Sequence, residues 1–374
     1  MAASPSTARA INDRLALRLL QDEGPLTATQ LKTLTGLSRP TVADLVERLS
    51  GSGLVHVVGE TGAERRGPNA KLYGIVADRA HLAALDVRTR SVSVVVADLL
   101  GTTLAEAAAP VGETGGTGAA VEQAVTLLQQ AAREAGADRL HTVAVGAPGL
   151  IDPATGELRD STGLPAWHRR LIGVLQERLP ARVLVENETN LAAVAELRAG
   201  AARDRDDFVL LWLGQGVGAA VVLDGRLRRG ASGGAGEIGF LPVPMTSGLP
   251  SATGCDGGFH ELACVSAVRA LAAAHGLDPA TALGSGHGPF LDALAQRLAV
   301  GAAAVAAVLD PGCVVLAGEI GHQGGPELAA RVEHALAGLS PLRTEVRATA
   351  LGDAAVLRGA LLRARDAAQD ELFP

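Results

Sequence analysis

The chain has few cysteines, few aromatic residues and no long apolar run. Its three cysteines, Cys255, Cys264 and Cys313, are too few for the disulfide framework of a small secreted domain. Aromatic residues make up 2% of the chain, which argues against a stacking platform for RNA or single-stranded nucleic acid. No apolar run reaches the roughly 18 residues of a membrane span. The first ten residues, MAASPSTARA, lack the charged head and apolar core of a signal peptide. We therefore expect a cytoplasmic protein without membrane contact.

Charge is distributed unevenly along the 374 residues, a length that predicts two or three domains. Residues 1–75 hold nine Lys or Arg against seven Asp or Glu, which leaves 24 basic and 33 acidic residues in the remainder. A mildly basic head on an acidic body is expected if the head binds an anion and the body does not. A random scatter of charge would give similar numbers.

The head has the pattern of a helix-turn-helix. Thr27 and Gln30 form a capping box that opens a short helix, and Thr35-Gly36-Leu37 is a tight turn. Ser38 can cap the next helix, with Pro40 in its first turn. The buried stripe of that helix is predicted to be Val42, Leu45, Val46 and Leu49.

Two predicted strands, Leu54–Val58 and Ala70–Ile75, follow this helix and enclose an arginine-bearing loop. Together these features predict a winged helix-turn-helix over residues 1–76. The start of a recognition helix contacts base edges, and wing arginines contact phosphates or the minor groove. The expected DNA-binding residues are Ser38, Arg39, Thr41, Asp44, Arg65, Arg66, Gly67 and Pro68. The alternative is a small helical interaction module whose arginines are merely solvated.

Residues 77–374 alternate strand-like and helix-like segments, which predicts an α/β fold. The segments LDVRTRSVSVVVADLLG and LWLGQGVGAAVVLDG each have the pattern of a strand, a turn and a second strand. This weak internal repeat predicts two related lobes around a cleft, at about 77–190 and 191–374.

The order of motifs resembles the ROK family. It runs from the winged head through VGAPGLID, VENETNLAAVAE, LGQGVGAAVVLDGRLRRGASGGAGEIG and LDPGCVVLAGEI to LGDAAVLRGA. The resemblance implies the two-lobed, actin-like fold of sugar kinases and a dimer or tetramer. The family includes sugar-responsive repressors and sugar kinases, and the head groups this chain with the repressors.

Two kinase motifs of the family are altered here. The family's Asp-x-Gly-Gly-Thr turn corresponds to Asp86-Val87-Arg88-Thr89-Arg90, so glycine's permissive backbone is lost. The family's catalytic Asp is replaced by Glu188, whose extra methylene displaces the carboxylate, and displacements of about 1 Å can cost roughly a hundredfold in rate. The turn Gly214–Gly218 persists, either as a nucleotide cradle or as a simple hairpin. We predict no phosphoryl transfer and no cofactor.

By the same resemblance, a sugar would be bound by Asn187, Glu188, Glu237 and Glu261, with the loop ending at Gly149 closing one side. The alternative for Asn187 and Asn190 is capping of the helix that follows. The family's zinc-binding His corresponds to Phe240. Cys255, His260 and Cys264 offer three ligands where a closed structural zinc site needs four, so no metal is expected.

We expect a dimeric repressor that binds an inverted repeat in double-stranded DNA and responds to a small ligand, in particular a sugar. One alternative is a bifunctional sugar kinase with a DNA-binding head. Another is a ligand-independent regulator that uses its body only to dimerise.

The head yields a paired prediction about DNA contacts. If Arg39 contacts a base edge, Arg39→Ala relaxes specificity at one operator position at a cost of about 1–3 kcal/mol. If Arg66 contacts phosphate, Arg66→Ala weakens binding to all sequences and lowers the salt dependence. Gel shifts against operator variants at several salt concentrations measure both effects. Unchanged profiles in both mutants would refute the assigned contacts.

Overall fold

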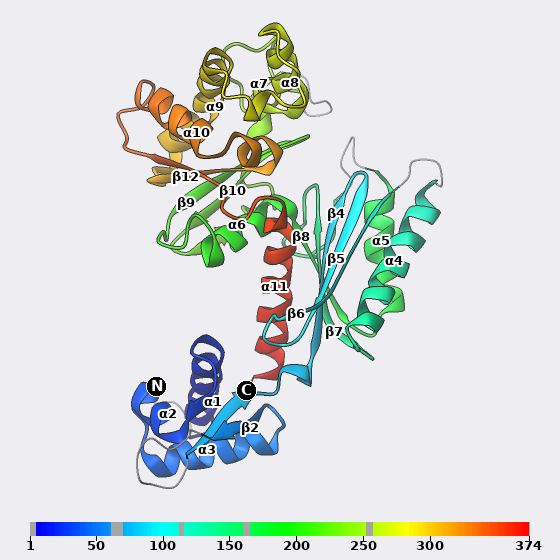
Figure 1. Cartoon of the computed structure of the whole chain (residues 1–374), viewed down its shortest axis with the longest axis vertical. Helices are drawn as coiled ribbons and strands as arrows, with labels where there is room; N and C mark the ends of the chain where they lie inside the picture. Colours follow the sequence, from blue (N-terminus) through cyan, green and yellow to red (C-terminus); the bar gives the residue numbers. More distant parts are fainter. Residues whose placement is uncertain (1–4, 61–69, 112–115, 160–164, 252–256, 374) are drawn as a thin grey trace.

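The computed structural model describes residues 5–60, 70–111, 116–159, 165–251 and 257–373, and these form a head and two lobes (Figure 1). The head contains three helices and a three-stranded sheet of order β1-β3-β2, so the winged helix-turn-helix prediction is confirmed. Its elements are α1 Pro5–Asp22, β1 Leu26–Thr27, α2 Ala28–Thr35, α3 Arg39–Gly51, β2 Val55–Glu60 and β3 Lys71–Ile75.

Local capping sets the helix ends in the head. Thr27 and Gln30 cap each other reciprocally at the start of α2, and Gly36, with φ of 70°, ends that helix. Helix α1 buries Leu17 and Leu20 but leaves Ile11 57% exposed. The buried face of α1 therefore does not include Ile11.

The first lobe is a five-stranded sheet of order β6-β5-β4-β7-β8. Its strands are β4 His81–Arg88, β5 Ser91–Ala97, β6 Thr103–Pro110, β7 Leu140–Ala147 and β8 Arg182–Asn187. Helices α4 Gly116–Glu134 and α5 Trp167–Arg178 cover one face of the sheet, and α11 Ala355–Leu372 covers the other (Figure 1). Leu85 therefore packs under α4 and α5, while its neighbour Ala84 packs on the side of α11.

The second lobe repeats this topology, with strand order β11-β10-β9-β12-β13. In each sheet the central strand has an antiparallel partner on one side and a parallel partner on the other, so the predicted internal repeat is confirmed. The strands are β9 Phe208–Leu213, β10 Val217–Leu223, β11 Arg226–Arg228, β12 Cys313–Ala317 and β13 Glu345–Ala348. The helices are α6 Glu188–Ala199, α7 His260–Ala263, α8 Val265–Ala274, α9 Gly288–Leu309 and α10 Gly318–Ala337.

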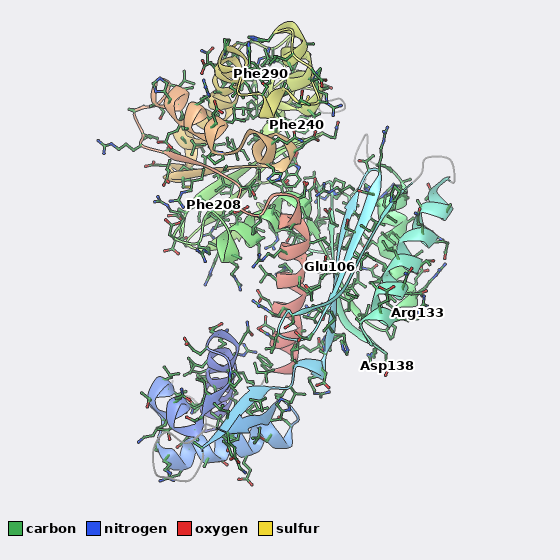
Figure 2. All side chains as sticks on the ribbon, in the orientation of Figure 1. Glu106, Arg133, Asp138, Phe208, Phe240 and Phe290 are labelled. Atoms are coloured by element: carbon green, nitrogen blue, oxygen red, sulfur yellow. The ribbon has the colours of Figure 1, made fainter. Side chains whose placement is uncertain are left out.

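Single-turn 3-10 helices complete the body. They are η1 Ala77–Arg79, η3 Ile238–Phe240, η4 Ala282–Gly284 and η5 Gly352–Ala354. Helix α6 covers the face of the second sheet that carries Phe208, and α8, α9 and α10 cover the opposite face. Phe290 lies in the core on that opposite face (Figure 2). Among the described residues, α9 is apolar enough to span a bilayer, but half of its most apolar window is buried, as in the core helix of a soluble protein.

Helix α11 is the last element of the chain, yet it packs on the first sheet, where it contacts β4 and β7. The predicted lobe boundary at about residue 190 places α11 in the second lobe. Helix α11 instead packs on the sheet of the first lobe, because its apolar face is complementary to β4 and β7. Helices α6 and α11 pack against each other between the two sheets (Figure 1). At Gly359 a Cβ would lie 2.0 Å from the carbonyl oxygen of Leu191, so only glycine allows this close approach.

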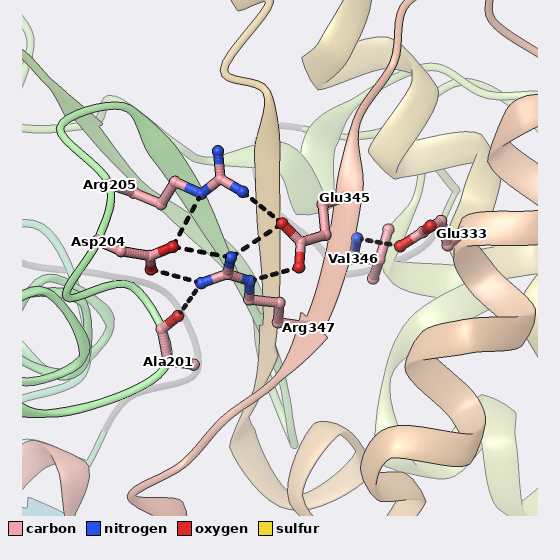
Figure 3. Close-up of polar contacts among 7 residues, drawn as sticks. All are labelled: Ala201, Asp204, Arg205, Glu333, Glu345, Val346 and Arg347. Carbon is pink, nitrogen blue, oxygen red and sulfur yellow. Dashed lines mark hydrogen bonds and ion pairs between the residues drawn. The ribbon is translucent and has the colours of Figure 1, made fainter.

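An ion-pair network holds the edge strand β13 to the segment that follows α6 (Figure 3). Arg347 donates to Asp204 Oδ1 at 2.6 Å, to Glu345 Oε1 at 2.8 Å and to the carbonyl of Ala201 at 2.6 Å (Figure 3). Arg205 joins the network through Glu345. Hydrogen bonds from Arg347 lower the pKa of Asp204 to about 2, so the network persists at any physiological pH.

The helix crossing yields a stability prediction. Gly359→Ala should lower the free energy of unfolding by about 1–3 kcal/mol, because the new methyl overlaps the Leu191 carbonyl and forces α6 and α11 apart. Gly173→Ala in α5 is the matched control, since a Cβ there meets nothing within 4 Å. It should be neutral or stabilise by up to about 1 kcal/mol. Urea denaturation of both variants measures the difference, and equal stabilities would contradict the role given to Gly359.

Candidate functional site

The junction of β8 and α6 brings the predicted ligand residues together. Asn187 Oδ1 accepts from the backbone N–H of Thr189 at 2.8 Å and of Asn190 at 3.3 Å, so Asn187 caps α6. Its Nδ2 donates to the carbonyl oxygen of Gly149 at 3.0 Å. Helix capping therefore belongs to Asn187 and not to Asn190, because α6 begins at Glu188 rather than at Leu191. The same amide fixes the loop at Gly149 beside the site.

An ion pair between the two lobes lies next to Asn187, the residue that caps α6. Glu186 at the end of β8 is buried, and its Oε2 accepts from Arg229 Nε at 2.8 Å and Nη2 at 2.6 Å. Its Oε1 accepts from Asn190 Nδ2 at 3.0 Å. Arg229 follows β11, so the pair links the first sheet to the second. Sequence reasoning missed Arg229, although it lies within the quoted motif GRLRRG.

Arg88 occupies the altered phosphate turn and is held by two aspartates. Its Nε donates to Asp86 Oδ2 at 2.8 Å, its Nη2 donates to the carbonyl oxygen of Asp353 at 3.4 Å, and its Nη1 lies 3.8 Å from Asp353 Oδ1. Burial raises the pKa of Asp86, and the charge of Arg88 opposes that rise. The guanidinium of Arg88 thus already has acidic and carbonyl partners within the protein.

Glu188 is the carboxyl group with unused hydrogen-bonding capacity. The residue keeps partial exposure, but its Oε2 is buried and has no hydrogen-bond partner. Burial raises the pKa of Glu188 to about 7. A hydrogen bond from its own backbone N–H opposes the rise, Asp86 and Glu237 add smaller contributions in the same direction, and Arg88 opposes it. A ligand hydroxyl that donates to this carboxyl would relieve the cost of burying it unpaired.

The carboxyl groups of Glu237 and Glu261 lie in different environments. Glu237 is exposed, at the entrance to η3, and partial burial of its carboxyl raises its pKa. Both oxygens of Glu261 accept from the N–H of Ser247, at 3.1 and 3.2 Å, and Oε2 also accepts from the N–H of Gly257 at 3.2 Å. Glu261 thus fixes its own loop. Phe240, at the position that corresponds to the family's zinc-binding His, lies in the second lobe and is 45% exposed (Figure 2).

Cys255, one of the three possible zinc ligands named above, lies outside the described residues. Within the described ranges, no group of three or more metal-ligating side chains is found. Cys264 is buried, and its Sγ lies 3.0 Å from Ser266 Oγ. Burial would raise the pKa of Cys264, but hydrogen bonds to His260 and Ser266 lower it to about 7.

The start of α3 forms the candidate DNA surface. Ser38 Oγ accepts from the N–H of Thr41 at 3.3 Å, which caps α3, and the side chain of Arg39 is exposed. Asp44 instead pairs with Arg48, which also donates to buried Asp13 of α1 at 2.6 Å. Asp44 therefore supports the packing of α3 on α1. The wing residues Arg65, Arg66, Gly67 and Pro68 lie outside the described residues.

Comparison with known proteins identifies both parts of the chain. A model of the ROK family matches residues 82–367. The chain belongs to the ROK family. A model described as winged helix-turn-helix DNA-binding matches residues 9–56.

Relatives of this ROK protein include regulators and kinases. It is 24% identical to the xylose repressor of Caldicellulosiruptor bescii over 266 residues, which cover 70% of this chain and 66% of the relative. It is 27% identical to the transcriptional dual regulator NagC of Escherichia coli K12 over 244 residues, or 62% of this chain and 57% of NagC. The aligned parts thus span less than two thirds of either regulator. A glucokinase of Halalkalibacterium halodurans is 32% identical over 130 residues, 35% of this chain and 39% of the kinase.

The fold is shared along the whole chain with a solved ROK family transcriptional regulator, described as a homologue of the Escherichia coli Mlc protein. The TM-score is 0.76 at 21% identity, with 98% of each chain covered. This similarity confirms the predicted arrangement of a winged head followed by a two-lobed ROK body.

The raised pKa of Glu188 predicts a pH-dependent stability. The fold favours the neutral acid, so this contribution is complete below the ordinary pKa of 4.5 and is lost as pH rises through about 7. Glu188→Gln removes the titration, so its melting temperature relative to the wild type should rise between pH 5 and pH 8. Glu122→Gln is the control, because pairing of the exposed Glu122 with Arg178 lowers its pKa. A constant difference between Glu188→Gln and wild type across this range would contradict the burial of an unpaired carboxyl.

Proposed function

We propose that this ROK protein is a DNA-binding transcriptional repressor whose affinity for its operator changes when a small polyhydroxylated ligand, a sugar or sugar derivative, binds beside Glu188. The observation that carries the proposal is the combination of a winged helix-turn-helix head with a body in which the buried Oε2 of Glu188 lacks a hydrogen-bond partner. Relatives named as a xylose repressor and as NagC support the same role.

The contacts at the β8–α6 junction support a ligand site there. Glu188 offers a buried acceptor at the β8–α6 junction, Glu237 offers an exposed carboxyl group near η3, and the Asn187–Gly149 contact fixes one wall. Because Glu188 lies where β8 of the first lobe meets α6, and Glu237 lies in the second lobe, one ligand that contacts both would favour a particular angle between the lobes. A ligand changes an equilibrium only by such a differential affinity. Glu261 serves in this proposal to hold the neighbouring loop.

We also propose that the protein is not a sugar kinase. Arg88 occupies the family's glycine-rich turn and is paired with Asp86 and Asp353, and Glu188 replaces the family's catalytic Asp. The kinase alternative keeps support from the glucokinase relative, which aligns with about a third of the chain. A phosphate cradle requires close approach of backbone N–H groups, which residues with Cβ atoms at the turn obstruct.

In this proposal the partner is double-stranded DNA carrying an inverted repeat, bound by a homodimer or tetramer in the cytoplasm. The two α3 helices of a dimer would contact half-sites about one helical turn apart, or a multiple of it. The exposed Arg39 and the capping pair Ser38 and Thr41 are the proposed base-reading residues of α3.

Two assays test the proposed function together. Footprinting on the gene's own promoter should reveal a protected inverted repeat, and addition of the effector sugar should change the protection. A coupled assay with ATP, Mg²⁺ and a panel of sugars should show no turnover, because the phosphate turn and the base are both altered. Turnover that Glu188→Gln abolishes would overturn the non-enzymatic assignment, and the absence of a protected repeat would overturn the repressor assignment.

A further inference from the structure

Helix α11 begins beside the candidate ligand site. The segment before it, residues 349–354, contains Asp353, whose carbonyl oxygen accepts from Arg88 at 3.4 Å and whose carboxylate lies 3.8 Å from the same guanidinium. Arg88 in turn holds Asp86, and both groups act electrostatically on Glu188. A shift of Asp86 or Arg88 on ligand binding therefore acts directly on the start of α11.

The other side of this segment is fixed to α6. Glu196 is fully buried, and its carboxylate accepts from the N–H groups of Ala350 at 3.1 Å and Leu351 at 3.2 Å, and from the hydroxyl of Thr349. Helix α6 begins at Glu188 itself. The start of α11 is thus connected to the candidate site both through Arg88 and through α6.

Helix α11 ends against the DNA-binding head. Arg14 of α1 donates from Nη2 to the carbonyl oxygen of Phe373 at 3.3 Å, and its Nη1 lies 3.9 Å from Asp370 Oδ1. A cation at a helix C-terminus is favourable because the last carbonyl groups lack partners. Phe373 is only 4% exposed and belongs to the same apolar cluster as Leu17 of α1 and Ile75 of β3. The head is therefore joined to the last turn of α11 by a polar contact, and Phe373 lies in the apolar cluster that also contains head residues.

Between these two ends α11 is a continuous helix of 18 residues, about 27 Å long at 1.5 Å per residue. It has no internal proline, and Ala360, Ala364 and Ala368 are fully buried. A helix that packs through small side chains lies close to its neighbours and moves as one body. A displacement at Asp353 is thus carried to Phe373.

A polar cavity of about 340 Å³ lies beside the Arg14 contact, between the head and the body. Arg14 and Arg18 of α1 line one side, and Arg198, Asp366 and Asp370 line the other. The head is held at the end of α11 but has open space next to that contact. Where this cavity lies, a change in the angle of α1 meets open space rather than packed side chains.

We propose that α11 is the lever that transmits ligand occupancy at Glu188 to the DNA-binding head, through Arg88–Asp353 at one end and Arg14–Phe373 at the other. This inference rests on the proposed function, since it names how that site regulates operator binding. The two ends give separate tests. One test requires the effector and the other does not.

The first test removes the contact between Arg14 and the end of α11 in the full-length protein. D-xylose and N-acetyl-D-glucosamine serve as probes, and operator affinity is measured with and without each sugar. Allosteric coupling commonly changes affinity by about 5- to 150-fold. Arg14→Ala should keep the affinity measured without sugar and reduce the sugar response to less than about twofold. Arg18→Ala, on the same helix and cavity wall, should retain the wild-type response. An undiminished response in Arg14→Ala would overturn the lever.

The second test needs no ligand and separates failure of the lever from failure of the proposed function. Hydrogen exchange of the amides of residues 14–22 is compared in Arg88→Ala, Asp353→Asn and the same-turn control Arg90→Ala. The first two variants should accelerate exchange by about two- to thirtyfold, the range of coupling found along such networks. Asp353→Asn changes an exposed side chain, so it tests the lever even if Arg88→Ala is unstable. Unchanged exchange in Asp353→Asn overturns the lever. If neither sugar alters the operator affinity of the wild type, the proposed effector class fails and the exchange result alone decides the lever.

Discussion

The close crossing of α6 and α11 is the contact on which the arrangement of lobes, site and head depends. Gly359 brings the backbone of α11 against the carbonyl of Leu191, so both helices fit between the inner faces of the two sheets. Helix α6 carries Glu188 at its start and Glu196 near its end, and α11 follows Asp353 and ends at the head. One steric constraint therefore fixes the spacing of three functional regions.

Charge pairing at the β8–α6 junction explains why the site is suited to recognition. Arg229 neutralises Glu186 and Arg88 neutralises Asp86, so the two cations of the cluster are already committed. Glu188 is left with a buried oxygen that has no donor. Leaving a buried acceptor unpaired costs about 1–3 kcal/mol. A hydroxylated ligand can recover that cost, whereas an anionic one would meet the carboxyl groups of Glu188 and Glu237.

The head is joined to the body without a long linker. The 3-10 turn η1 connects β3 to β4, and the N–H of Leu99 donates to the carbonyl of Ala77 at 2.9 Å. A single apolar cluster contains Leu17 of the head, Leu82 of the first sheet and Phe373 of α11. The head thus shares an apolar cluster with the elements of the body that carry it.

Elements that depend on local chemistry could be predicted from the amino-acid sequence. The capping box at Thr27, the αL turn at Gly36 and the Ser38 cap lie within a few residues of the groups they bind, so the winged head could be predicted. The duplicated hairpins and the order of the ROK motifs predicted the two lobes. Strand β6 was missed because its alanine-rich segment TLAEAAAP has little strand propensity, and pairing with β5 supplies its structure.

The pairing of distant charges depends on the packing of the folded chain. This packing paired Arg229 with Glu186 across the lobes, Arg88 with Asp353 across 265 positions of sequence, and Arg14 with Phe373 across 359. It also gave the α6 cap to Asn187 and used Glu261 to hold a loop. Local patterns fix backbone conformation over one or two helical turns, but contacts between distant side chains depend on how α6 and α11 pack, and no short stretch of sequence records that packing.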